Sequence, residues 1–294
     1  MIDDSDLAAF EQARPALRGL AYRILGSIAE AEDAVQDTFV KWQAADRAAI
    51  ETPQAWLTTV CTRRCLDLLK AADRARVDYV GPWLPEPVHT VTDGAPAELA
   101  ASVTTAFLLL LDRLSPKERA AYLLREIFDH DYAEVARILG VQEAACRKLV
   151  SRAQAALRRE KPRQVVPPAR QEELLDAFQL AVNSGATDRL SALLADDIAL
   201  RADGGGKVAA ATRVLRGRDE VLAFLTRVLG RAWPQWRQER QEINGNLGMV
   251  LFEGAAIRAS ITFGFDAGGA ASDIYIMRNP EKFGGLAEDA GRLH

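Results

Sequence analysis

Apolar residues in the first 76 positions recur at the spacing of amphipathic helices. Three stretches show this pattern: residues 7–26, residues 29–42, and a stretch that begins at Thr52-Pro53. Gly26 suits the end of the first helix, and Pro53 suits an early position in the third. In the second helix the repeating apolar positions are Ala34, Val35, Phe39 and Trp42. These patterns predict an all-helical N-terminal segment.

A second helical segment covers residues 98–160, and Ser115-Pro116 followed by Glu118 predicts a helix start inside it. Within this segment, residues 131–159 predict a helix-turn-helix, with Gly140 in the left-handed conformation at the turn. The second helix of that motif carries a buried stripe that begins at Cys146. Its polar residues Glu143, Arg147, Lys148, Ser151 and Arg152 fall off the stripe.

The pattern changes after a proline-rich joint at residues 161–169. Residues 170–194 predict two helices, and residues 218–229 predict another. Strand-like runs occupy residues 197–202, 209–215, 235–243, 248–253, 255–265 and 272–278. The expected fold class is two all-α domains followed by an α+β module with an antiparallel sheet. The expected division is 1–76, a linker at 77–97, 98–160, a linker at 161–169, and 170–294.

The charge of this chain is segregated. The formal net charge is −4, from 37 basic and 41 acidic residues. Two stretches are nevertheless basic: Arg63, Arg64, Lys70, Arg74 and Arg76, and then Arg147, Lys148, Arg152, Arg158, Arg159, Lys161 and Arg163. Two separate cationic faces can neutralise phosphates whatever the net charge. The distribution favours a nucleic-acid partner.

Several kinds of chemistry are not expected. The chain has three cysteines and three histidines, and they are scattered. Cys61 and Cys65 supply too few ligands for zinc, and Cys146 lies on a buried stripe. We therefore expect no metal, no cofactor and no catalytic residue. The acidic N-terminus lacks a signal-peptide pattern and no apolar run is long enough to span a membrane, so a cytoplasmic protein is expected.

Three motifs together resemble a known family. EAEDAVQDTFVKW (30–42), TPQAWLTTVCTRRCLDLLK (52–70) and the helix-turn-helix are similar to extracytoplasmic-function (ECF) sigma factors of bacteria. The matches correspond to sigma region 2 and sigma region 4. The resemblance implies two partners, promoter DNA and RNA polymerase core, the latter through its β′ clamp helices and β flap.

The resemblance also implies residue roles. It assigns core-polymerase binding to Asp33, Gln36, Asp37 and Phe39. Contacts near the −10 element fall on Arg63, Arg64, Lys70, Arg74 and Arg76. Reading of the −35 element in the major groove falls on Arg147, Lys148, Ser151 and Arg152, with Arg158 and Arg159 nearer the DNA backbone.

A narrower resemblance concerns one subgroup, whose C-terminal domain is SnoaL-like and regulates the sigma factor in cis. Three motifs carry it: WLPEP (Trp83, Leu84, Pro85, Glu86, Pro87), DGGGK (Asp203, Gly204, Gly205, Gly206, Lys207) and NPEKF (Asn279, Pro280, Glu281, Lys282, Phe283). The usual tail motif of the subgroup is close to NPDKL, so Glu281 and Phe283 are mild departures. An exposed Trp83-Leu84 pair would be an apolar liability. We therefore expect the C-terminal module to clasp the WLPEP linker and region 2. The sequence does not decide whether this module binds a small molecule.

Two other functions compete with this interpretation. SnoaL-like domains also include cyclases and isomerases, in which a buried carboxylate acts as general base, and here Asp203 or Asp273 would have that role. A simple repressor would use only the helix-turn-helix and would leave the 30–42 motif and the 63–76 basic stretch without a role. The character of any cavity around the two aspartates separates the enzyme from the sigma factor.

Overall fold

The computed structural model describes residues 4–75, 79–90, 102–158 and 166–286. The chain divides into two compact units. The first contains the described residues up to 75 and those from 110 to 158. The second contains residues 79–90, 102–109 and 166–286. Residues on both sides of the helix-turn-helix segment therefore belong to the second unit.

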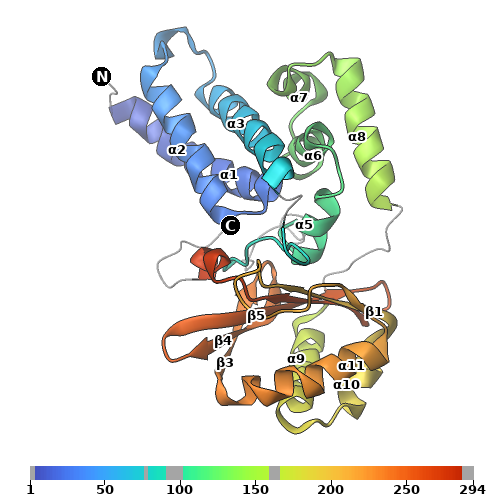
Figure 1. The fold of residues 1–294 in the computed structure, drawn as a ribbon. Coiled ribbons are helices and arrows are strands. Elements are labelled where there is room, and N and C mark those ends of the chain that lie inside the picture. Colours follow the sequence, from blue (N-terminus) through green and yellow to red (C-terminus); the bar gives the residue numbers. More distant parts are fainter. Residues whose placement is uncertain (1–3, 76–78, 91–101, 159–165, 287–294) are drawn as a thin grey trace. The chain divides into compact units, whose positions relative to one another are not determined.

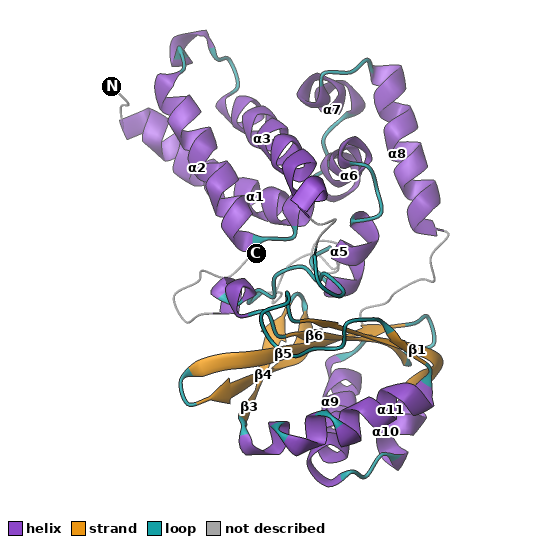
Figure 2. Ribbon diagram, in the orientation of Figure 1, coloured by secondary structure: helices purple, strands orange, loops and turns teal. Residues whose placement is uncertain are grey.

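The first unit is helical throughout its described part, apart from connecting turns (Figure 2). Its first half contains α1 (Asp4–Leu25), α2 (Ile28–Ala44), a short 3-10 turn (Arg47–Ala49) and α3 (Pro53–Ala75). Gly26 takes a positive φ of 72° after α1, and Ser27 caps α2 by accepting a hydrogen bond from the Glu30 N–H. Phe10 packs on Phe39, and Trp42 packs on Trp56. The three helices predicted from apolar spacing are confirmed.

The second half of this unit follows α5 (Thr105–Leu111), within which the division between the units falls. It contains α6 (Pro116–Tyr122), a π-helical turn (Leu123–Ile127), α7 (Tyr132–Leu139) and α8 (Glu143–Arg158). Ser115 and Glu118 form a reciprocal capping box at the start of α6, where the sequence predicts a helix start. Gly140 ends α7 with φ 63° and ψ 45°, which confirms the predicted turn. The π-helical turn was not predicted.

The second unit is built on a sheet with helices. Its helices are α9 (Pro168–Ser184), α10 (Asp188–Leu193) and α11 (Arg218–Arg227), with 3-10 turns at Leu229–Arg231, Trp233–Gln235, Pro280–Lys282 and Gly284–Leu286. Its strands are β1 (Leu194–Asp203), β2 (Leu215–Arg216), β3 (Arg237–Ile243), β4 (Asn246–Glu253), β5 (Ala256–Phe265) and β6 (Ala271–Met277). The described strands form one sheet in the order β2-β1-β6-β5-β4-β3.

The two faces of this sheet bury different parts of the chain. Side chains alternate between faces along a strand, so Ile274 and Ile276 of β6 lie in the cluster with α9 and α11. Tyr275 and Met277 lie in a second cluster, on the opposite face, which also contains Leu84. Figure 1 shows α9, α10 and α11 on one face of the sheet. The other face receives residues from the 79–90 segment, the start of α5 and the C-terminal tail.

Two expectations about this unit are wrong. Residues 209–215 do not form the expected strand, because only Leu215 and Arg216 pair with β1. Ala210 and Ala211 instead pack against the core from a loop. The sheet is also not wholly antiparallel, because β1 pairs with β6 in parallel. In the described part of the chain, no helix is long and apolar enough to cross a membrane.

Candidate functional site

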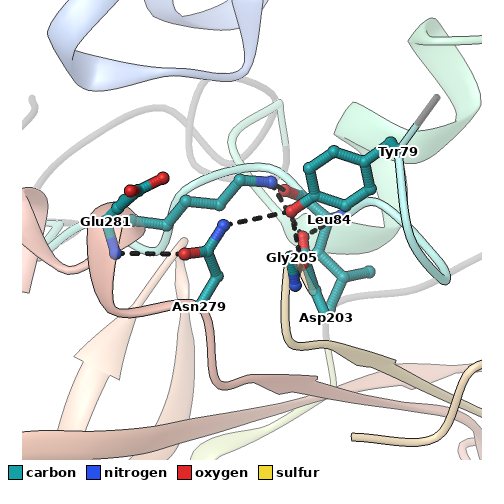
Figure 3. A network of polar contacts seen from close by, with 7 residues as sticks. Tyr79, Leu84, Asp203, Gly205, Asn279 and Glu281 are labelled. Carbon is teal, nitrogen blue, oxygen red and sulfur yellow. Dashed lines mark hydrogen bonds and ion pairs between the residues drawn. The ribbon is translucent and has the colours of Figure 1, made fainter. Parts of the chain in front are cut away.

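The centre of the site is the carboxylate of Asp203, which is fully buried at the end of β1 (Figure 3). Its Oδ2 accepts hydrogen bonds from the Leu84 N–H at 2.8 Å and from Lys282 Nζ at 2.8 Å. Its Oδ1 accepts from the Tyr79 hydroxyl at 2.6 Å and from the Gly205 N–H at 3.0 Å. A buried carboxylate is tolerated when it is paired and hydrogen-bonded. Asp203 therefore joins the 79–90 segment to the C-terminal tail.

The ammonium group of Lys282 is the second centre of this network. Besides Asp203, its Nζ donates to the Leu84 carbonyl oxygen at 2.7 Å. The same Nζ lies 4.5 Å from the ring centroid of Trp83 and 5.0 Å from that of Tyr79. A cation over aromatic rings is attracted to their negative faces. The 79–90 segment thus encloses a cation supplied by the tail.

Glycine is required next to Asp203 because side chains of the 79–90 segment and the tail approach this loop closely. Gly205 and Gly206 have φ of 57° and 70°, a region that side chains rarely adopt. A Cβ on Gly205 would overlap Asn279 Nδ2 and would lie 3.1 Å from the Tyr79 hydroxyl oxygen. A Cβ on Gly206 would lie 3.3 Å from the side chain of Val80. Asn279 Nδ2 in turn donates to the Tyr79 hydroxyl at 3.1 Å. Only glycine lets the loop and the segment meet in this way.

The remaining motif residues lie around this network. Leu84 and Phe283 belong to the apolar cluster on the sheet face, and Pro85, Glu86 and Pro87 are buried. Lys207 lies outside the network and forms an exposed ion pair with Glu281 at 2.9 Å. We call residues 79–90, held by Asp203, Asn279 and Lys282, the clasp.

The burial of Tyr79 affects its acidity. Burial raises the pKa of Tyr79 above its ordinary value, and the hydrogen bond that its hydroxyl donates to Asp203 raises it further. The hydroxyl therefore keeps its proton at neutral pH and stays a donor to the carboxylate.

The predicted polymerase-binding residues lie on one helix of the first unit. Asp33 and Gln36 are exposed on α2, and Asp37 is partly exposed and paired with Arg64 at 2.6 Å. Phe39 is partly buried against Phe10, whereas Trp42, which shares its apolar spacing, is only 1% exposed and belongs to the core. Val40, not predicted, is 56% exposed beside them. We call Asp33, Gln36, Asp37 and Val40 the α2 outer face.

The basic residues of α3 are differently engaged. Arg63 is exposed, and it donates from Nε to the Ile138 carbonyl oxygen at 3.0 Å and from Nη2 to the Arg137 carbonyl oxygen at 3.1 Å. Lys70 is exposed and pairs with Asp67 at 3.0 Å. The Arg74 side chain and Arg76, also predicted to contact DNA, lie outside the described residues.

The predicted base-reading residues share one face of α8. All four are exposed: Arg147, Lys148, Ser151 and Arg152. Cys146, Val150 and Ala153 are buried on the opposite side, which confirms the predicted stripe. Arg147 pairs with Glu143 at 2.6 Å and lies 4.2 Å from the ring centroid of Tyr132. Arg158 is exposed, and Arg159 lies outside the described residues.

Comparisons with known proteins assign the first unit. A model of Sigma-70 region 2 matches residues 9–75, and a model of Sigma-70 region 4 matches residues 104–157. The chain is 35% identical to the ECF RNA polymerase sigma factor SigJ of Mycobacterium tuberculosis (strain ATCC 25618 / H37Rv), over 95% of this chain and 94% of that protein. This chain is an ECF sigma factor. RNA polymerase core and promoter DNA are therefore its partners.

Two further similarities cover almost the whole sigma factor. A probable ECF sigma factor, SigI of M. tuberculosis (strain CDC 1551 / Oshkosh), is 29% identical over 97% of each chain. The crystal structure of M. tuberculosis SigJ superposes with a TM-score of 0.74 at 32% identity, and the match covers 95% of this chain and 98% of that one. The expected order of domains is confirmed, because two helical sigma domains precede a mixed α/β region, although its sheet is not wholly antiparallel.

Sequence reasoning missed two features of this sigma factor's clasp. Tyr79 lies four residues before the WLPEP motif and 124 positions from Asp203, and no local pattern signals that contact. The motif DGGGK also placed Lys207 beside Asp203, but the cation that pairs with the carboxylate is Lys282.

The carboxylates proposed for the enzyme alternative are both paired with cations. Asp203 pairs with Lys282, and Asp273 pairs with Arg201. A pocket of about 640 Å³ lies elsewhere in the second unit, between β3–β5, the tail and His89. Neither aspartate lines that pocket. A general base needs a carboxylate free to take a proton from a substrate, and these two carboxylates are already occupied by cations.

Proposed function

We propose that this sigma factor docks on the β′ clamp helices of RNA polymerase core through the α2 outer face. Acidic and amide groups beside an exposed Val40 suit a basic helical partner, because complementary charge steers and orients an encounter. Region 4 would dock on the β flap. In this proposal the basic face of α3 contacts the −10 element and α8 reads the −35 element in the major groove.

We further propose that the C-terminal module regulates the sigma factor in cis by means of the clasp. The carrying observation is the buried carboxylate of Asp203, which binds the Leu84 N–H and Lys282 at the same oxygen. Residues 79–90 precede region 4 in the chain, so a module that holds them restricts where region 4 can go. The SnoaL-like assignment of this module belongs to the proposal and is supported by its sheet, with helices on one face.

We also propose that this protein catalyses no reaction of its own and that it acts on core polymerase in the cytoplasm. The pairing of Asp203 and Asp273 with cations supports the first point. A small-molecule ligand would bind in the 640 Å³ pocket beside the tail, since ligand pockets commonly measure about 300–1,000 Å³.

Core binding tests the docking surface. Asp33→Arg reverses a charge on the α2 outer face, and Glu11→Arg makes the same change on an exposed position of α1. Affinity for core polymerase, measured by fluorescence anisotropy with labelled full-length protein, should fall at least tenfold for Asp33→Arg and stay within twofold for Glu11→Arg. Equal affinities of the two variants would rule out the assigned surface.

A further inference from the structure

Two arginines cap helix ends across the contact between region 2 and region 4, inside the first unit. Arg63 of α3 donates to the carbonyl oxygens of Arg137 and Ile138, at the C-terminus of α7. Arg119 of α6 donates to the carbonyl oxygen of Ile24, at the C-terminus of α1, at 2.7 Å. The last carbonyls of a helix have no partner within the helix, and they carry the negative end of its dipole. Each region therefore supplies a cation to a helix end of the other.

The surroundings show that this contact is built into the core. Arg119 is 5% exposed and also donates to the Leu111 carbonyl oxygen at 2.9 Å and to Asp112 at 3.0 Å. Arg23 of α1 is 2% exposed and lies 5.6 Å from the ring centroid of Phe128. Burial lowers the pKa of Arg23 to about 10. Buried guanidinium groups persist only where their hydrogen bonds are satisfied, so the closed arrangement is specific.

The closed arrangement conflicts with simultaneous promoter contacts. Ile138 touches Arg63, and nine residues of chain lead from Ile138 to Arg147. Nine residues span at most about 30 Å. The −10 and −35 elements are separated by about 25 base pairs, on the order of 85 Å at about 3.4 Å per pair. The two DNA-facing surfaces must separate before both elements can be bound.

We propose that Arg63 and Arg119 form a lock that keeps regions 2 and 4 closed, and that Arg63 exchanges the α7 carbonyls for a DNA phosphate when the lock opens. This lock rests on the proposed DNA-binding role of α3. The same guanidinium cannot serve both partners, since its Nε and Nη2 both point at α7 in the closed form. Promoter binding and opening are thereby coupled through one side chain.

Distance measurement on the full chain tests the lock. Dyes would be attached at Ala44→Cys and Ala155→Cys, both exposed, while the native Cys61, Cys65 and Cys146 are buried. Arg63→Lys keeps the charge but loses the planar fork that reaches two carbonyls. Arg14→Lys is the matched control, because Arg14 is exposed and pairs with Glu11 and Glu32 of the same region.

In single-molecule energy transfer, Arg63→Lys should raise the ratio of long-distance to short-distance molecules at least fivefold, and Arg14→Lys should leave it unchanged. Equal ratios in wild type and Arg63→Lys would overturn the lock. Arg119→Lys should act like Arg63→Lys, with circular dichroism as the check on folding. Because Arg119 is buried, the exposed Arg63 remains the deciding position if that variant unfolds.

A separate experiment with DNA tests the proposed exchange of the α7 carbonyls for a phosphate. A mixed-sequence single-stranded DNA dodecamer, at a concentration that saturates binding by anisotropy, should convert wild-type protein to the long-distance form. An unchanged distance distribution at saturation would overturn the exchange. These readouts need no polymerase, so a failure of core binding would be seen separately.

Discussion

Lys282 Nζ and Asp203 Oδ2 form an ion pair of 2.8 Å in which the carboxylate is fully buried and the lysine is 8% exposed. The pair joins the end of β1 to the C-terminal tail, and both partners also bind the backbone of Leu84. Desolvation of two charges is offset here by hydrogen bonds to three chain segments. The clasp is thus held by charge at its centre and by apolar burial of Leu84 beside it.

Removal of one partner of this pair should be costly. Lys282→Met leaves the Asp203 carboxylate buried without its cation, and such a change typically costs about 3–5 kcal/mol. Lys207→Met removes an exposed ion pair with Glu281, which typically contributes at most about 1 kcal/mol. Denaturant unfolding of the full chain, followed by fluorescence, measures both. A Lys282→Met variant as stable as Lys207→Met would contradict the buried pair.

Two glycine substitutions distinguish the cost of backbone strain from the cost of a steric overlap at position 205. Gly205→Ala and Gly254→Ala both place a side chain at positive φ, but a Cβ on Gly254 meets nothing within 4 Å. Gly254→Ala should therefore cost only the left-handed strain, about 1–2 kcal/mol. Gly205→Ala must also displace Asn279, so amide exchange at Leu84 should accelerate in this variant alone. Equal exchange rates at Leu84 in the two variants would show that the close approach is unimportant.

Local chemistry made much of this fold predictable. The Ser115–Glu118 capping box and the left-handed Gly140 depend on neighbouring residues, so the sequence contains their whole cause. The strand expected at 209–215 failed because a run of small and β-branched residues also suits a loop packed on a core. The parallel pairing of β1 with β6 depends on tertiary packing and has no local signal.

The candidate site also has features that the sequence predicts and features that only the tertiary structure shows. The motifs containing Asp203 and Lys282 were identified from sequence, but the pairing of these two residues spans 79 positions. The engagement of Arg63 with α7 was likewise invisible, because it depends on where region 4 folds back. The exposed face of α8 was predictable, since helical period alone fixes it.

Alkaline pH should weaken the clasp through Tyr79. Its pKa is raised in the folded protein by burial and by Asp203, above an ordinary value of about 10. The stabilisation is therefore complete below about pH 10 and is lost as the pH rises through the folded-state pKa. Tyr79→Phe removes the ionisable group. Thermal unfolding at about pH 8 and about pH 11 should show a larger loss in wild type than in Tyr79→Phe, and identical losses would exclude Tyr79 as the cause.

Residues of α8 that read bases should differ from those that contact phosphates in how strongly their loss depends on the DNA sequence. Arg147→Ala or Arg152→Ala should cost about 1–3 kcal/mol at the upstream element if the side chain reads a base edge. Arg158→Ala should weaken binding evenly across sequences and reduce the salt dependence by about one charge. Binding to promoter and scrambled duplexes across a salt series measures both. Three variants with the same profile would mean that the groove assignment is wrong.

Run-off transcription with core polymerase tests the central claim that the C-terminal module controls this sigma factor through the clasp. Asp203→Asn weakens the pair with Lys282 without touching the α2 outer face or α8, and Lys207→Ala is the control outside the network. At equal core occupancy, Asp203→Asn should raise transcript yield several-fold, and Lys207→Ala should stay within twofold of wild type. A yield from Asp203→Asn equal to or below that of wild type would contradict the account.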